Sequence, residues 1–407
     1  MQLPKPFLGA LGGAFITLQL LFLANMCYLY GTAYHDSLRY STMKLLFVDY
    51  DQDVIGQSVM TAYDQMKGPS FPTVQRHPIT EYPTEQDVRN AVCKGHYWGA
   101  IYSKANASAR LATALSSPEA ARVYNNSQAL TYIWNGAKYS AYAQSVYSML
   151  VQLVQGTGGV YDQMNGTTIL STANISDPYI AKTVLDPISS SSIDLQPMAQ
   201  GVRFYYNTVS MVMPILQQFF FLMALNGISA QFKIFSSLSL KQNMVLRLII
   251  SICYTFIASL CMSGYIWAFR EDWNATSDQF GLTWMAIWLV MHLNFLIIDA
   301  ATAFIPMQFM SFFMLTWIIL NVSSSIGPFE LSPGFYRLGY VFPAHELYEI
   351  LLQIWTDGCN PHLYRALPIL WSEWIVALGL SLLGMRKRTK PVTPVQVTSQ
   401  AVKEDMA

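Results

Sequence analysis

The chain has 407 residues, of which 53% are hydrophobic and only 12% are charged, and its formal net charge is zero. This composition is too apolar for an ordinary soluble surface, so most of the chain must contact lipid. The lack of net charge argues against a nucleic-acid partner. No glycine-rich phosphate loop and no cofactor motif occurs, so we expect no ATPase domain and no cofactor in this chain.

The first apolar run predicts a membrane helix near the N-terminus. It extends from Phe7 to about Gly31, which is longer than a signal-peptide core and suits an uncleaved signal anchor within residues 1–31. Lys5 lies just before this run. On the other side, the first Lys or Arg is Arg39, eight positions after Gly31. Because positive charge stays on the cytosolic side, we expect a cytosolic N-terminus.

The polar segment after this span predicts an extracytoplasmic domain over residues 32–206. It contains four glycosylation sequons, at Asn106, Asn125, Asn165 and Asn174. Their position agrees with the topology, because the first span would carry this segment across the membrane. We therefore expect a glycosylated domain outside the cytosol.

The start of this domain has an α/β pattern. Lys44 to Val48 is typical of a strand, and Val54 to Met66 has helical spacing. Thr84 followed by Asp87 forms a capping-box pattern that opens a helix, and Tyr97 to Ser103 then alternates like a strand. The sequence therefore predicts an α/β domain.

For the rest of the domain, the secondary-structure prediction rests on amino-acid composition alone. Ala107 to about Gln155 is rich in Ala, Leu, Gln, Ser and Tyr, which predicts helix. Gly156 to Ile193 is rich in Gly, Ser, Thr and Asn, which predicts a loop. We therefore expect the regular structure of the domain to end near Gln155.

Five further apolar runs predict a membrane domain over residues 207–385. Each is near the length that crosses the hydrocarbon core. They extend over about Met211–Ile228, Met244–Phe269, Phe280–Ile298, Ala303–Leu320 and Ala366–Gly384. With the first run they predict a polytopic α-helical membrane protein of about six transmembrane helices, with the α/β domain inserted between the first and second spans.

Loop charges set the expected orientation. The connection after the second span carries Lys233, Lys241 and Arg247 and no acidic residue, as cytosolic loops do. The connection after the third span is acidic and holds a fifth sequon at Asn274. A basic cluster opens the tail over residues 386–407. We expect both termini in the cytosol, in a plasma-membrane or endomembrane protein.

Residues 344–355, between the fifth and sixth spans, predict an interfacial or re-entrant helix. Apolar side chains recur there at helical spacing opposite ionisable ones, with Leu347, Ile350, Leu351 and Ile354 against His345, Glu346 and Glu349. The segment is too short and too charged to be a seventh span. Glu349 stands where a zinc helix needs its second histidine, so we expect no metal site.

Six ionisable or amide side chains fall at membrane depth, where exposure to lipid is costly. They are Gln217, Gln218, His292, Asn294, Asp299 and Glu373. These side chains are candidates for a substrate path. The alternative, that they form hydrogen bonds between helices or lie at the interface, stays open. No catalytic residue is assigned.

Two of the five cysteines, Cys93 and Cys359, lie in predicted extracytoplasmic segments. They form either a disulfide or two separate thiols, and the sequence leaves both alternatives open. The other three, Cys27, Cys253 and Cys261, fall inside apolar runs and form no disulfide framework.

Three stretches carry a resemblance to a known family: Lys44-Leu45-Leu46-Phe47-Val48-Asp49-Tyr50-Asp51, Tyr97-Trp98-Gly99-Ala100-Ile101-Tyr102-Ser103 and Gly339-Tyr340-Val341-Phe342-Pro343-Ala344. The sequence resembles the fungal nitrosoguanidine-resistance membrane proteins, which are related to the membrane domain of type-2 ABC exporters. The order of one span, an outer α/β domain and a five-span block is similar too. The resemblance implies export of toxic small molecules, and it assigns no catalytic residue.

We therefore predict a permease-like protein that exports amphipathic small molecules, in toxin resistance or secondary-metabolite efflux. Its expected partners are the lipid bilayer, the amphipathic substrate and a second copy of the chain in a homo-oligomer. One alternative is a membrane-embedded biosynthetic enzyme of a secondary-metabolite pathway, with His292, Asp299 or Glu373 as the acid or base. The other is a scaffold for lipid homeostasis or protein trafficking.

Overall fold

The computed structural model describes residues 4–198, 201–271 and 273–389. Within these residues, six helices are long and apolar enough to cross a membrane. They are α1 (Lys5–Thr32), α8 (Val209–Gln231), α10 (Leu240–Ala268), α11 (Ser277–Phe304), α12 (Met310–Ser325), which η4 (Met307–Phe309) precedes, and α14 (Leu363–Arg388). The chain is a polytopic α-helical membrane protein, as the hydropathy predicts. From position 390 onward, the predicted tail lies outside the described residues.

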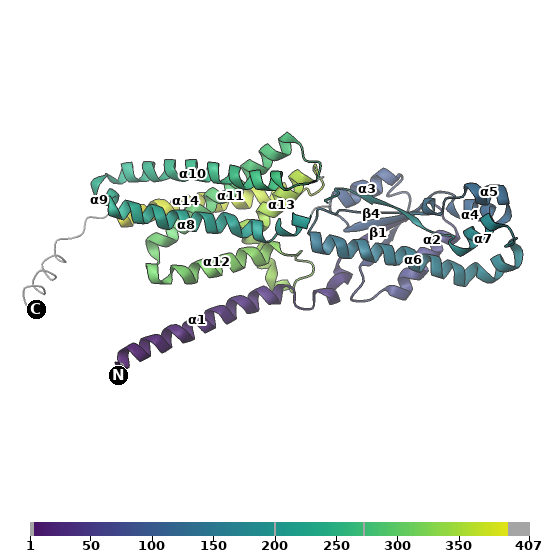
Figure 1. Ribbon diagram of the computed structural model, residues 1–407, viewed down its shortest axis with the longest axis horizontal. Coiled ribbons are helices and arrows are strands. Elements are labelled where there is room, and N and C mark those ends of the chain that lie inside the picture. Colours follow the sequence, from purple (N-terminus) through teal and green to yellow (C-terminus); the bar gives the residue numbers. More distant parts are fainter. Residues whose placement is uncertain (1–3, 199–200, 272, 390–407) are drawn as a thin grey trace, which may run out of the picture.

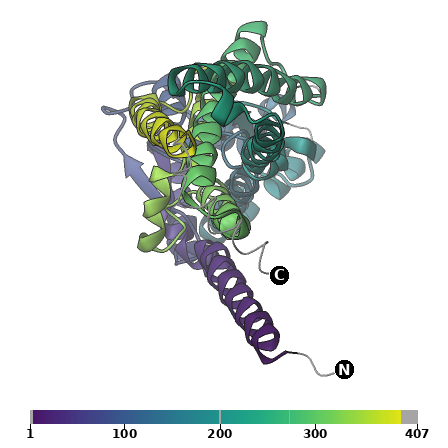
Figure 2. The ribbon, with the colours of Figure 1, turned by 90° about the vertical axis from the view of Figure 1, so that its left-hand side faces the viewer.

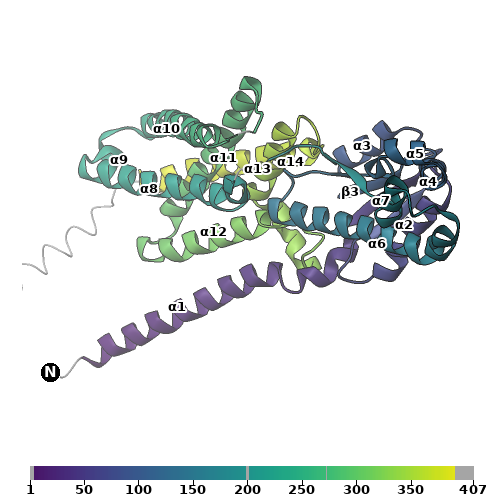
Figure 3. The ribbon, with the colours of Figure 1, turned by 45° about the vertical axis from the view of Figure 1, so that its right-hand side comes forward.

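Helix α11 is the central helix of the membrane bundle. It packs against α8, α10 and α14 (Figures 1 and 2). In its most apolar window 56% of the residues are buried, against 28% or less in the other five helices. Helix α1 diverges from the bundle (Figure 3) and contacts α12 near its C-terminal end, where Asn25 Nδ2 donates to Thr316 Oγ1 over 3.3 Å.

A short helix, α13 (Pro343–Trp355), lies where the bundle meets the sheet (Figure 1). The 3-10 helix η5 (Gly334–Val341) leads into it, and proline occupies its first turn, where no backbone donor is needed. Thirteen residues rise about 20 Å, which is too short to cross about 30 Å of hydrocarbon. Helix α13 therefore coincides with the helix predicted over residues 344–355. At the opposite end, α9 (Ile234–Ser237) connects α8 to α10.

A five-stranded mixed sheet forms the centre of the second region, residues 36–205. Its strands are β1 (Lys44–Asp49), β2 (Thr73–His77), β3 (Gly99–Ser103), β4 (Leu130–Trp134) and β5 (Ser190–Asp194), in the order β2-β1-β3-β4-β5. Strand β1 is parallel to β2 and β3, β3 is antiparallel to β4, and β4 is parallel to β5. All residues of β1 after Lys44 are buried, as expected for a strand covered on both faces.

Helices cover both faces of this sheet. Phe47 contributes to a core shared with α2 (Val54–Met66) and α6 (Ser140–Thr172), whereas Val48 packs with α3 (Glu85–Cys93) on the other face. The remaining helical elements of the region are η1 (Asp36–Thr42), α4 (Ala107–Ser116), α5 (Pro118–Val123), η2 (Asn126–Gln128), α7 (Pro178–Leu185) and η3 (Gly201–Tyr205).

The structure corrects the assignment of residues 107–193. Strand β4 interrupts the stretch that composition assigns to helix, and α6, α7 and β5 occupy most of the stretch that it assigns to loop. Helix α6 continues through Gly156, where it packs against Ala62 and Met66 of α2. The atom nearest to a Cβ built there is Met66 Cε, the end of a flexible side chain, so packing of α6 against α2, and not the glycine itself, stabilises the helix at this point.

Candidate functional site

A groove of about 830 Å³ opens between α11, α13 and α14. Its apolar wall and its polar rim come from different turns of the same helices. The wall consists of Leu282, Met285, Ala286, Trp288, Leu289, Ile350, Ile354, Leu363, Leu367 and Trp371, and the rim of Thr276, Asp278, Gln279, Gln353, Asp357 and Gly358. We call this site the α11–α14 groove. It offers apolar surface along the spans and carboxylate and amide groups at one end.

The groove lies at the N-terminal ends of two spans. Asp278 is in the first turn of α11, and Leu289 lies about 16 Å further along the helix axis. Trp371 is in the third turn of α14, which starts at the same end of the bundle (Figure 1). An occupant of the groove would therefore place a polar end near α13 and an apolar body between the helices.

Local contacts fix α13 as one wall of this groove. Gln279 Nε2 donates to the Ile354 carbonyl over 2.9 Å, and Trp355 Nε1 donates to Thr283 Oγ1 over 3.0 Å. Gln279 also belongs to the capping box of α11. The turn after α13 then takes a left-handed conformation at Asp357, with φ of 50°. The first turns of α11 therefore hold the C-terminal half of α13.

The other face of α13 carries a buried polar cluster. Glu349 Oε1 accepts a hydrogen bond from Tyr139 over 3.0 Å, and its Oε2 accepts bonds from Asn360 over 2.8 Å and from His362. Burial would raise the pKa of Glu349, but the bonds from His362 and Asn360 hold it well below its usual range. Glu349 is therefore ionised and fully partnered.

Two neighbouring side chains on α13 share one arginine. Arg365 Nε lies 3.2 Å from Glu346 Oε1, and Arg365 Nη2 donates to His345 Nε2 over 3.3 Å. His345 Nδ1 donates to the Ser324 carbonyl, so the ring is the neutral Nδ1–H tautomer. Burial lowers the pKa of His345 to about 4 and raises that of Glu346 to about 7, the latter against the opposing effect of Arg365.

Helix α13 is also bound to the sheet region. Cys93, at the end of α3, forms a disulfide with Cys359, in the turn after α13. Tyr139 N donates to the Tyr348 hydroxyl over 2.9 Å, next to the Tyr139–Glu349 bond. The disulfide settles the alternative that the sequence leaves open, and α13 therefore connects the sheet region to the groove.

Of the residues predicted for a substrate path, His292 forms a bridge between three helices. Trp374 Nε1 of α14 donates to His292 Nδ1 over 2.9 Å. The other ring nitrogen, Nε2, therefore carries the proton and donates to Ser251 Oγ of α10 over 3.0 Å. Both ring nitrogens of His292 are thus occupied by neighbouring helices.

Asp299 lies in a buried ion cluster at the opposite end of the bundle from α13. It accepts hydrogen bonds from Arg247 Nη2 over 2.6 Å, from Arg388 Nη1 over 2.8 Å and from Ser381 Oγ over 2.6 Å. Arg247 also donates to Asn226 of α8, so residues of α8, α10, α11 and α14 meet at this carboxylate. In the sequence, Arg247 resembles a loop charge and Arg388 a tail charge, so neither is predicted as a partner of Asp299.

The other predicted residues have different surroundings. Asn294 Oδ1 accepts a bond from Trp317 of α12 over 2.9 Å, whereas Gln218 is fully buried and neither of its amide atoms has a partner among the described residues. Gln217 is half-buried, and Glu373 has a buried Oε2 without a hydrogen-bond partner in the described chain. None of the six predicted residues lines the α11–α14 groove.

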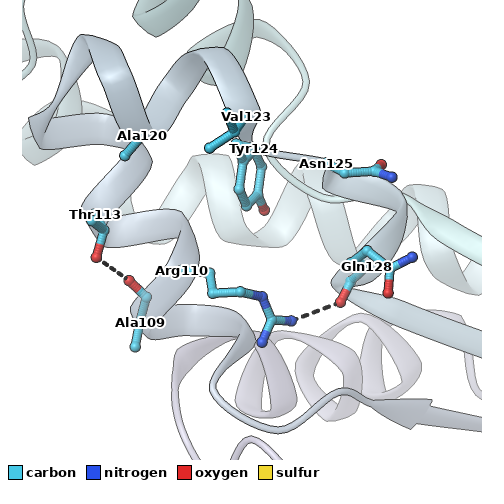
Figure 4. Close-up of a pocket in the computed structure, with 8 residues that line it drawn as sticks. All are labelled: Ala109, Arg110, Thr113, Ala120, Val123, Tyr124, Asn125 and Gln128. Carbon is cyan, nitrogen blue, oxygen red and sulfur yellow. Dashed lines mark hydrogen bonds between the residues drawn. The ribbon is translucent and has the colours of Figure 1, made fainter.

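The predicted glycosylation sites are mostly on the surface. Asn106, Asn125, Asn174 and Asn274 are exposed, whereas Asn165 lies within α6 and donates from Nδ2 to the Tyr161 carbonyl over 3.1 Å. Asn125 also borders a cavity of about 420 Å³ between α4, α5 and η2. Figure 4 shows Arg110 reaching across this cavity to the Gln128 carbonyl, which leaves few free polar groups inside it.

The fold and the groove define a class: a multi-pass helical membrane protein with a sheet region attached through an interfacial helix. The chain belongs to the family described as "Protein of unknown function (DUF3533)", which matches residues 14–379. It is similar to the "Uncharacterized endoplasmic reticulum membrane protein YJR015W" of Saccharomyces cerevisiae, with 27% identity over 150 residues. That match covers 34% of this chain and 28% of the yeast protein.

Proposed function

We propose that this protein moves amphipathic molecules across a membrane and that they bind in the α11–α14 groove. The observation that carries the proposal is the groove itself, because its apolar wall and polar rim match a molecule with an apolar body and a polar end. A cavity with such a wall at membrane depth is open to lipid-soluble compounds. The resemblance to nitrosoguanidine-resistance proteins supports export to the side that holds the sheet region.

The proposal includes an orientation. The sheet region and the turn after α13 share a disulfide, which forms in an oxidising compartment such as the ER lumen or the cell exterior. We therefore place the sheet region, with its sequons, outside the cytosol and both termini inside. The ER name of the yeast relative favours an endomembrane location.

The enzyme alternative receives less support. None of its candidate acid or base residues, His292, Asp299 and Glu373, lines the groove, and the first two bind other side chains of the bundle. A catalytic group must reach a substrate atom, directly or through one water. Transport through a groove without chemistry therefore fits the geometry better.

The test is an accumulation assay with two matched tryptophan variants. Ala286→Trp places an indole inside the groove, whereas Val376→Trp adds the same side chain on α14 at a position that is 61% exposed, away from the groove. Host cells and their microsomes would receive a panel of fluorescent amphipathic cations, anions and lipids at equal protein levels.

The expected result is lower accumulation on the cytosolic side with the wild type and Val376→Trp, and accumulation like that of empty vector with Ala286→Trp. Equal accumulation with wild type and empty vector across the panel would overturn the proposed function. Full activity of a correctly folded Ala286→Trp variant would move the binding site away from the groove.

A further inference from the structure

We infer that the α11–α14 groove binds amphipathic cations in preference to neutral or anionic amphipaths. The head of the occupant would be a quaternary ammonium or a protonated amine, and its apolar body would lie along the wall. The inference rests on the proposed function, since it names the class of molecule that this groove takes. It starts from the charges on the rim and from the bonds that the polar side chains there already form.

The rim of the groove carries negative charge without a counter-charge. Asp278 and Asp357 both line it, and among the described residues no Lys, Arg or His side chain lines the groove. Arg365, in the first turn of α14, contacts Glu346 outside the groove. We call the side chains of Asp278 and Asp357 the rim carboxylates. They leave the polar end of the groove with two negative charges.

The other polar side chains of the rim are already bonded to the backbone. Gln279 Oε1 accepts a hydrogen bond from Thr276 N over 2.9 Å, and Gln353 Oε1 accepts one from Asn360 N over 3.1 Å. The rim carboxylates, by contrast, form no hydrogen bond and no ion pair within the described part of the chain. The acceptors that the rim leaves free for a ligand are therefore charged ones.

The stability of the fold does not account for the charge of Asp357. Asp278 lies in the first turn of α11, where a carboxylate stabilises the positive end of the helix dipole. Asp357 instead lies two residues after Trp355, the last residue of α13, and so at the negative end of a dipole. Its φ is 50°, a conformation that glycine and asparagine adopt readily without a charge. An uncharged residue would suit the fold better, so the carboxylate points to a cationic ligand.

The dimensions of the groove fit a cation with a long apolar body. The wall continues for about 16 Å along α11 from Asp278 to Leu289, and Trp288 and Trp371 add broad apolar surfaces. A volume of about 830 Å³ is in the range of pockets that hold drug-sized molecules. An ammonium head at the rim would be attracted by both carboxylates, whereas a carboxylate or sulfate head would be repelled.

Three photoreactive amphipaths test the inference. They share one apolar body with a diazirine and an alkyne, and they end in a trimethylammonium group, in its neutral tert-butyl isostere or in a carboxylate. The full-length protein in nanodiscs of zwitterionic lipid would be irradiated with each compound at low salt, and the adducts mapped by peptide mass spectrometry. Adducts on residues 282–289, 350–357 and 363–371 are divided by those on α1, which corrects for partition into lipid.

The trimethylammonium compound should label the groove at least about threefold more than the neutral isostere, and the carboxylate compound should label it least. The double variant Asp278→Asn, Asp357→Asn should lower labelling by the cation to the level of the neutral compound, because asparagine keeps the volume and tolerates a positive φ. Glu271→Gln is the matched control. Glu271 is exposed, precedes α11, has the same φ of 50° and does not line the groove, so its variant should label like the wild type.

Equal labelling of the groove by the three compounds would overturn the inference and leave the groove as a binding site. A cation preference that survives in the double variant, or that Glu271→Gln also removes, would overturn the role of the rim carboxylates. No labelling of the groove above that of α1 by any compound would overturn the binding site and the inference together. Cation-selective labelling without any effect of the protein on cellular accumulation would support the inference and reject the proposed function.

Discussion

Variants at Asp299 and Arg388 should lower the stability of the protein by amounts that follow from the charges around the Asp299 carboxylate. The carboxylate is fully buried and is the one acidic partner that the structure shows for Arg247 and Arg388. Asp299→Asn leaves the buried guanidinium of Arg247 and the partly exposed guanidinium of Arg388 facing a neutral amide. Breaking a buried ion pair in this way costs about 3–5 kcal/mol, because the remaining charge has lost its compensation.

The matched variant Arg388→Met should cost much less. It leaves the neutral Arg247–Asp299 pair in place and removes three hydrogen bonds, to Asp299 Oδ1, to the Asp299 carbonyl and to Thr302 Oγ1. The side chain of Arg388 is 12% exposed, so water or a lipid headgroup can take over part of its role. We expect a loss of about 1–2 kcal/mol.

The stability of the variants would be ranked by their apparent melting temperatures in one detergent, measured by fluorescence-detected size-exclusion chromatography. The expected order of stability is wild type, then Arg388→Met, then Asp299→Asn. Because membrane proteins commonly unfold irreversibly, only the order and the relative size of the shifts are compared, at one fixed heating time. A melting temperature of Asp299→Asn equal to that of the wild type would refute the assigned ion cluster, as would a larger loss with Arg388→Met.

Three further predictions follow from the region around α13 and the sheet. Maleimide should label Cys93 and Cys359 only after the protein is unfolded and treated with a reducing agent, and Cys93→Ser should lower stability by about 2–5 kcal/mol; labelling of both thiols in the untreated native protein would contradict the disulfide. N-glycosidase F should increase the mobility of the protein on a gel. Asn106→Gln, Asn125→Gln and Asn174→Gln should each reduce this shift by the contribution of one glycan, whereas Asn165→Gln should reduce it little. An unchanged mobility after the enzyme treatment would place the sheet region in the cytosol. Burial keeps the pKa of His345 in the folded protein at about 4, below its ordinary value of 6.5. The unfolded chain therefore binds the extra proton first, and stability should fall as the pH drops from about 6.5 to 4. His345→Gln should show a smaller decline, and an equal decline would assign the effect to other groups.

The sequence predicts the membrane spans well because each is a local property. A hydrophobic run of sufficient length has few alternatives to a membrane helix, so the six spans and the short α13 form as predicted. The bounds differ at one connection, because α11 continues to Phe304 and α12 begins only at Met310, after the predicted start at Ala303. Local capping is equally accessible: Thr84 and Asp87 form both hydrogen bonds of the predicted capping box. Asp53, which follows β1, likewise caps α2.

Partners that are distant in the sequence are not predictable in this way. Asp299 meets Arg247 and Arg388 across 52 and 89 residues, and each of the three looks unpaired in its own segment. A partial signal exists in α14, because Trp374, Ser381 and Arg388 recur every seven residues and contact His292 and Asp299, which are also seven apart. The groove has no such signal, since it results from how α11, α13 and α14 pack.

Strand β4 and the long helix α6 show the limit of composition. Leu130 to Trp134 lies within helix-favouring sequence and becomes a strand because β3 and β5 supply partners on both sides. Gly156 lies in a stretch that composition assigns to a loop, and it is helical because α6 packs along α2. In both cases tertiary packing overrides the local preference of the chain.

Photocrosslinking inside the membrane would show whether amphipathic molecules bind in the α11–α14 groove. The full-length protein would be isolated from cells fed a fatty acid that carries a diazirine and an alkyne, irradiated, and its adducts mapped by mass spectrometry. The groove predicts adducts concentrated on residues 282–289, 350–357 and 363–371, lost in Ala286→Trp and retained in Val376→Trp. Adducts spread evenly over the lipid-facing helices and unchanged in Ala286→Trp would contradict a binding site between α11, α13 and α14.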